Sequence, residues 1–117
     1  MQYNPGLIMT VEASSQIKAN CFVGFSGTAC TVGKGAIGVT ICGADKGQGC
    51  DVVTSGSAVV RAGAAVIKEA RLASDADGQA VTAEAGNIIN AIALESGAKG
   101  DLIEVMIVPP IMKEVTG

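Results

Sequence analysis

Large and small residues alternate along much of the chain with a period of two. In Ala36–Cys42 the odd-numbered positions are isoleucine or valine, and the even-numbered ones are alanine, glycine, threonine or cysteine. Ile88–Leu94 ends in the same alternation, with isoleucine and leucine opposite alanine. Successive side chains of a strand point to opposite faces, so both segments are predicted to be β-strands. Leu102–Val108 is a longer apolar run of strand character, and we expect Pro109-Pro110 to end it.

Shorter segments with strand character lie between these runs. They are Leu7–Val11, Cys21–Phe25, Thr28–Val32, Asp51–Thr54, Ala58–Arg61, Arg71–Ser74 and Gln79–Thr82. Glycine-containing turns separate them, since glycine adopts the positive φ of a tight turn at little steric cost. Asp77-Gly78 is typical of a β-hairpin loop, and Ser55-Gly56 is also expected to be a turn. Short strands at this spacing predict an all-β protein, a small β-barrel or sandwich.

One segment could be helical. Ala62–Leu72 contains alanine, lysine, glutamate and arginine, which are good helix formers. Gly63 at its start and the strand-like Arg71–Ser74 at its end oppose a helix there. The sequence therefore allows at most one short helix.

Positions about fifty residues apart resemble one another. Three groups match: Ile17-Lys18 with Ile67-Lys68; Gly27, Ala29 and Thr31 with Gly78, Ala80 and Thr82; and Val39, Ile41, Lys46, Gly47, Asp51 and Val52 with Ile92, Leu94, Lys99, Gly100, Glu104 and Val105. The increasing offset places small insertions in loops, although sequences rich in glycine and alanine also match by chance. We expect an N-terminal arm, residues 1–12, and a single β domain, residues 13–117. An internal duplication would give this domain repeat-like halves at about 17–54 and 67–107.

Composition and charge exclude several classes of function. With 117 residues and a hydrophobic fraction of 49%, the chain suits one folded domain. A net charge of −3 and an aromatic fraction of 3% argue against nucleic-acid binding, which uses clustered basic residues and aromatic stacking platforms. No apolar run approaches the roughly 20 residues of a membrane helix. No secretory signal is visible at the N-terminus, so we expect folding in a cytoplasm.

The four cysteines fit two interpretations. Cys21, Cys30, Cys42 and Cys50 form no C-x-x-C pair, and the chain has no histidine to complete a zinc site. In a reducing compartment they would remain thiols and act as small hydrophobic residues. Alternatively, Cys42 and Cys50 flank a glycine-rich loop and could form a disulfide across a hairpin.

The sequence contains few residues suited to catalysis. Without histidine there is no Ser-His or Cys-His dyad, and most charged residues lie at turns. Gly33–Gly38 satisfies G-x-G-x-x-G, but a strand-like rather than a helical segment follows it, against a nucleotide site. Asp75 and Asp77 lack the later ligands of a calcium loop and fit better as turn formers. We therefore expect no enzyme activity, no cofactor and no metal.

The first residues precede the repeated segments and contain the only tyrosine. Pro5 favours an extended conformation at Asn4. This segment is either a frayed terminus or a strand that becomes ordered by adding to a partner.

Several motifs together resemble a known family. Cys21–Gly27, Ala36–Val39 and Val59–Ala65 are similar to the capsid cement, or head decoration, proteins of tailed bacteriophages. Leu72–Val81, which contains the sequence SDADGQAV, is especially similar, and Ala91–Glu95 followed by Gly100–Val105 resembles the closing segment of that family. The resemblance covers about residues 17 to 108. The four cysteines are not themselves part of the family pattern, although Cys21 begins the first of these segments.

The resemblance implies a function as well as a fold. It suggests a mainly β protein that binds the exterior of an icosahedral HK97-like shell, commonly as a homotrimer, and stabilises it. The partners would be the major capsid protein and other copies of the chain, with no nucleic acid or membrane. Its location would be the virion, with a host cytoplasmic stage during assembly. We expect the arm to contribute capsid contacts through Gln2, Tyr3, Asn4, Pro5 and Leu7.

Two other functions remain open from the sequence. One is a different structural β module of the virion or tail, such as part of a fibre or baseplate. The other is a cytoplasmic β-barrel that binds a small ligand, which would need a well-formed apolar pocket with a few convergent polar groups.

Overall fold

Strands form all of the regular structure in the described part of the chain. The computed structural model describes residues 5–24 and 27–112, and this part of the chain contains eight strands and no helix. They are β1 (Pro5–Glu12), β2 (Phe22–Val23), β3 (Gly38–Thr40), β4 (Gly49–Arg61), β5 (Arg71–Ser74), β6 (Ala80–Thr82), β7 (Ile88–Ala93) and β8 (Leu102–Met112). The predicted all-β class is confirmed. Over the described residues, no helical segment meets the length and hydropathy that a membrane span requires.

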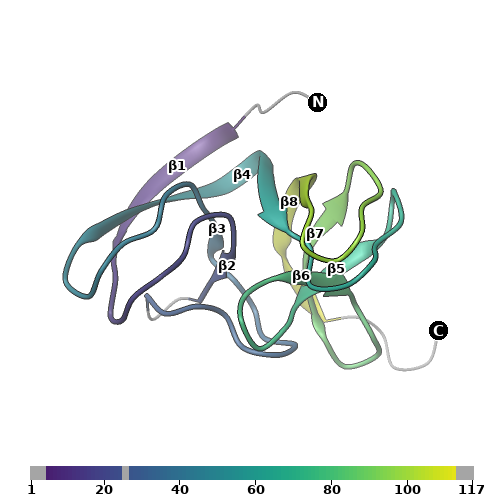
Figure 1. Cartoon of the computed structure of the whole chain (residues 1–117), viewed down its shortest axis with the longest axis horizontal. Helices are drawn as coiled ribbons and strands as arrows, with labels where there is room; N and C mark the ends of the chain where they lie inside the picture. Colours follow the sequence, from purple (N-terminus) through teal and green to yellow (C-terminus); the bar gives the residue numbers. More distant parts are fainter. Residues whose placement is uncertain (1–4, 25–26, 113–117) are drawn as a thin grey trace.

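All eight strands belong to one antiparallel sheet. The order is β2-β3-β4-β8-β7-β5-β6, with β1 added to β4. The sheet is not closed into a barrel, because β2 and β6, at its two ends, do not pair with each other in the described part of the chain. Figure 1 shows β1, β2 and β3 around the first part of β4, and β5 to β8 beyond its second part.

The longest strand, β4, joins the two halves of the molecule. Residues 49–56 pair with β1, whereas Ser57–Arg61 pair with β8. Ser55-Gly56, expected to be a turn, lies instead within this continuous strand. Gly56 has a φ of +83°, so the positive φ of a turn glycine is used here inside a strand. We call residues 5–55 the N-terminal half and residues 57–112 the C-terminal half.

Two other local expectations were wrong. Thr28–Val32 does not form a strand, since only Ala29 makes an isolated bridge, to Val23.

Pro109-Pro110 does not end the last strand, because β8 continues to Met112 and pairs there with the start of β7. Proline lacks a backbone N–H and is therefore tolerated mainly at the edge of a sheet. Since β4 pairs only with Leu102–Met106, the later part of β8 has no strand on its β4 side, and the prolines lie there. Opposite the two prolines, the register of the β7–β8 pairing shifts between Ile89 and Ala91.

Ala62–Leu72 does not form the helix that its composition allowed. The Val66 backbone N–H donates to the Gly97 carbonyl at 2.9 Å, so this segment pairs with a distant loop instead of with itself. Glu69 has a φ of +76°, a conformation that a right-handed helix excludes. Downstream, the predicted Asp77-Gly78 hairpin is confirmed, since β5 and β6 pair antiparallel around it and Gly78 has a φ of +79°.

Two buried clusters fill the fold. The smaller lies within the N-terminal half and contains Ala13, Ile17, Cys21, Val23, Ala44, Cys50 and Val52. The larger fills the interior of the C-terminal half and extends onto one face of the strands of the N-terminal half. Phe22, Val39 and Val53 contribute to it from that face. These three side chains are at most 1% exposed, so apolar packing joins the halves.

Buried hydrogen bonds also cross between the halves. Asn90, which is 2% exposed, accepts from the Ala36 backbone N–H at 2.9 Å and donates to the Lys34 carbonyl at 3.1 Å. The Phe22 N–H donates to the Gly78 carbonyl at 2.7 Å. Losing one such partner would leave a buried polar group unpaired, at a cost of about 1–3 kcal/mol.

Gly38 supplies a test of this packing. An added Cβ there would collide with the Val53 carbonyl oxygen and come within 2.7 Å of Val52 Cγ1. Gly38→Ala should therefore lower the free energy of unfolding by about 1–3 kcal/mol, measured by urea denaturation. Gly24→Ala is the matched control, because its nearest contact is an ordinary 3.6 Å to the Thr28 carbonyl oxygen. Equal losses for the two variants would contradict this packing.

Candidate functional site

The most exposed apolar strand of the molecule's described part is β1. Leu7, Ile8 and Met9 are 56%, 46% and 43% exposed, although they are consecutive and point alternately to opposite faces. Val11, further along, is partly buried against the smaller cluster. The beginning of β1 thus presents large apolar side chains on both faces. Exposed apolar groups gathered in this way are typical of an interaction surface.

The predicted capsid-contact residues fall at this end of the chain. Gln2, Tyr3 and Asn4 lie outside the described residues, and Pro5 pairs with Gly56 at the start of β1. Leu7 pairs with Ser55, and its carbonyl oxygen accepts from Thr54 Oγ1 at 3.3 Å. Of the expected arm, residues 5–12 therefore form a strand on the edge of β4 (Figure 1).

A second exposed apolar surface is formed by β7, by Leu94 directly after it, and by β8. Leu94, Leu102 and Met106 are 39%, 44% and 42% exposed, and Ile92 is partly buried. Ile92 pairs directly with Met106, so their side chains share one face of the sheet. We call these four residues the outer face of β7–β8. The amino-acid sequence alone does not reveal this face, because only the register between the two strands brings the residues together.

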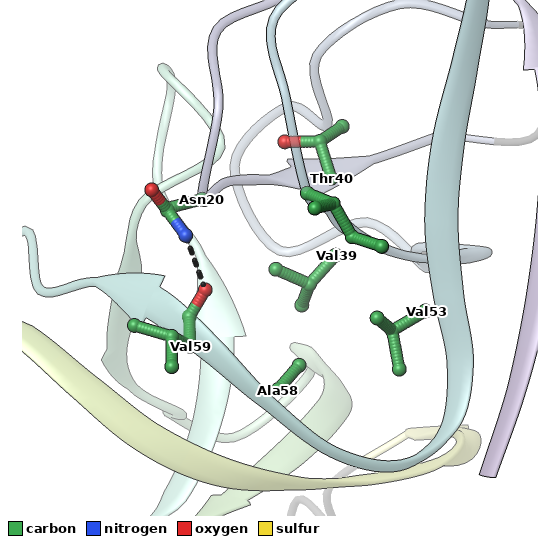
Figure 2. Close-up of a pocket in the computed structure, with 7 residues that line it drawn as sticks. Asn20, Val39, Thr40, Val53, Ala58 and Val59 are labelled. Carbon is green, nitrogen blue, oxygen red and sulfur yellow. Dashed lines mark hydrogen bonds between the residues drawn. The ribbon is translucent and has the colours of Figure 1, made fainter. Parts of the chain in front are cut away.

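A shallow cavity of about 260 Å³ lies where the two halves meet. Val39 and Val53 line it from the N-terminal half, and Ala58 and Val59 line it from the second part of β4 (Figure 2). The Asn20 Nδ2 atom donates to the Val59 carbonyl at 3.1 Å, so this hydrogen bond is already made within the protein. With few polar groups directed into it, the cavity offers little to orient a small ligand.

The residues considered for chemistry have structural roles. Asp75 Oδ1 accepts backbone hydrogen bonds from Asp77 at 2.8 Å and Gln79 at 2.9 Å, as expected of a turn former. Gly38, the last glycine of the G-x-G-x-x-G match, lies in β3, so no helix N-terminus follows that motif. Across residues 5–24 and 27–112, no group of three or more histidine, cysteine, aspartate or glutamate side chains is placed to hold a metal ion.

All four cysteines are free thiols, so the alternative disulfide between Cys42 and Cys50 is not formed. Cys42 is exposed, whereas Cys21, Cys30 and Cys50 are buried. Burial raises the pKa of each buried thiol above its usual value, because a thiolate loses hydration there. Since the thiolate is the nucleophile, the three buried cysteines should be unreactive.

The comparisons with known proteins define the class. A profile of the phage cement protein family matches residues 1–108, and the chain belongs to this family. The class is thus that of structural proteins of the phage virion. Among curated proteins, none matches the chain.

A solved structure has a similar fold. It is described as the N base of the head fiber gp8.5 in bacteriophage phi29, with a TM-score of 0.72 and 19% sequence identity. The alignment covers 92% of this chain and 98% of that one. At this level of identity the similarity concerns the fold.

Thiol titration tests the described burial. In the native protein one thiol, Cys42, should react rapidly with a disulfide reagent, and all four should react after denaturation. Cys42→Ser should abolish the fast phase, whereas Cys50→Ser should leave it intact. Two missing thiols in the denatured, unreduced protein would show instead that a disulfide had formed.

Proposed function

We propose that this chain is a capsid decoration protein that binds the outside of an assembled HK97-like shell as a homotrimer and stabilises it. Membership of the phage cement protein family carries this proposal. The exposed apolar strand β1 supports it, because a protein that acts by binding needs an accessible contact surface. The major capsid protein is the proposed partner.

Stabilisation follows from selective binding. A protein that binds the assembled shell but not free subunits shifts the equilibrium towards the shell by mass action. Many copies on one shell add their contributions, and a homotrimer adds the effect of multivalency. No catalytic group is needed for this role. The proposed location is the exterior of the virion, after a stage in the host cytoplasm during assembly.

We assign the capsid contact to the N-terminal residues Gln2, Tyr3, Asn4, Pro5 and Leu7. Leu7 supports the assignment because it is 56% exposed and adjoins the register irregularities at the beginning of β1. An edge strand also has unpaired backbone groups that a partner can use. Tyr3 would add the only tyrosine of the chain to this contact.

A second candidate function is the attachment of a fibre. The structural similarity to a head fiber base favours it, since almost all of that base aligns with this chain. The two functions differ in what the capsid-bound protein carries. A decoration protein carries no further protein, whereas a fibre base would hold a fibre on the capsid surface.

Removal of the N-terminal residues tests the contact. Deleting residues 1–6, or substituting Leu7→Ser, should weaken binding to empty expanded capsids about tenfold or more, equivalent to about 1.4 kcal/mol or more. Unchanged circular dichroism would show that the fold survives. Binding is measured by cosedimentation with capsids lacking the protein.

Val32→Ser is the matched control, because Val32 is 61% exposed in the loop between β2 and β3. Undiminished occupancy after the deletion would refute the assignment of the contact. If the wild-type chain does not bind capsids at all, the proposed function itself is wrong.

A further inference from the structure

We propose that copies of this chain associate head to tail, with β1 of one copy against the outer face of β7–β8 of the next. The occupant of the outer face, and of β1 from Ile8 to Glu12, is a second copy, whereas Leu7 and the residues before it belong to the proposed capsid contact. The proposal rests on the self-association in the proposed function and specifies the surfaces that make it. It follows from a contact that the chain already makes within itself.

The two halves repeat the same strand register. Glu12 pairs with Gly49 in the N-terminal half, and Arg61 pairs with Leu102 in the C-terminal half. The next four pairs of each ladder correspond in the same way, at offsets of 49 residues in the first strand and 53 in the second. These pairs are Val11–Cys50, Thr10–Asp51, Met9–Val52 and Ile8–Val53, against Val60–Ile103, Val59–Glu104, Ala58–Val105 and Ser57–Met106. Therefore β1 is the equivalent of the second part of β4.

Other features recur at the same offsets. Val39 pairs with Val53, and Ile92 pairs with Met106. Asn20 and Glu69, 49 residues apart, are the two non-glycine residues recorded with positive φ in the described chain. The Ile17–Ala44 bridge corresponds to Val66–Gly97, one residue earlier than the sequence match of Ile17 with Ile67 implies.

Within one chain, the C-terminal half covers the outer face of the N-terminal sheet. Val39 and Val53 are each 1% exposed there, in the same buried cluster as Ala58. Their equivalents are Ile92, which is partly buried, and Met106, which is 42% exposed. The surface that is covered in the first half is therefore open in the second.

The covering element has an open equivalent as well. Ala58 on β4 is 1% exposed, whereas its equivalent Met9 on β1 is 43% exposed. The internal contact has two sides: the N-terminal face with Val39 and Val53, and the second part of β4 that covers it. The equivalents of these two sides, the outer face of β7–β8 and β1, are both exposed in each chain. Two different, complementary surfaces produce a heterologous contact, which forms a ring when the rotation closes.

One of the two hydrogen bonds at the edge of β4 can be repeated between copies, the one from backbone to backbone. The Arg61 N–H donates to the Asn20 carbonyl at 2.8 Å, and Asn20 Nδ2 donates to the Val59 carbonyl, so Asn20 covers the edge of β4. The equivalent edge of β1, at Thr10 and Glu12, has no strand partner in the described chain. In the proposed contact, the carbonyl of Glu69 from the neighbouring copy would accept from the Glu12 N–H. The side-chain bond has no equivalent, because the Glu69 carboxylate cannot donate to the Thr10 carbonyl.

Sedimentation velocity on charge variants tests the proposal. Met9→Glu places a charge in the β1 side of the contact, and Met106→Glu places one in the outer face. Both methionine side chains are exposed in the single chain, so the fold should survive either substitution. Each variant alone should lose the ring and associate at least tenfold more weakly than the wild type. An equimolar mixture should form a dimer, because each partner supplies the surface that the other lacks. Val32→Glu is the control and should associate normally.

Several outcomes would overturn the head-to-tail contact. They are a Met106→Glu variant that associates like the wild type, a mixture that stays monomeric, and a wild-type chain that is monomeric even at millimolar concentration. Met9→Gln and Met106→Gln repeat the test without charge. The wild-type capsid-binding assay is independent of this readout, so failure of the contact and failure of the proposed function can be distinguished.

Discussion

The fold depends on the continuity of β4 through Gly56. One strand completes the N-terminal sheet with its first part and starts the C-terminal sheet with its second, so the halves cannot separate without breaking it. Packing of Phe22 and Val53 against the interior of the C-terminal half, and the buried bonds of Asn90, fix the angle between them. The buried polar side chains Thr40, Ser74 and Asn90 all have backbone partners. Such an interior suits a protein whose function lies on its surface.

Local signals in the sequence predicted much of this fold. Period-two alternation located β3 and β7, and the Asp77-Gly78 turn located β5 and β6, because these elements are set by residues close in sequence. The failures concern long-range pairing. Gly56 looked like a turn because nothing local shows that β1 and β8 extend the ladder across it. Likewise, the prolines of β8 are acceptable only because β4 ends its pairing before them.

The candidate surfaces were predictable only in part. The N-terminal residues are distinct in the sequence because they precede the repeated segments, and Leu7 among them is exposed. The outer face of β7–β8 could not be found in this way, since a period-two strand shows which side chains share a face but not which face is covered. Met106 and Val53 have equivalent positions, and only the fold shows that one is open and the other buried.

The apolar surfaces at both ends of the repeat and the family membership support the proposal that this protein acts by binding to a shell and to itself. Electron cryomicroscopy of phage heads with and without the purified chain tests this most directly. Added density should appear on the outside of the expanded shell, as rings of copies in repeated positions, and be absent from untreated heads. Density confined to the tail or portal, or none on the shell, would contradict the account.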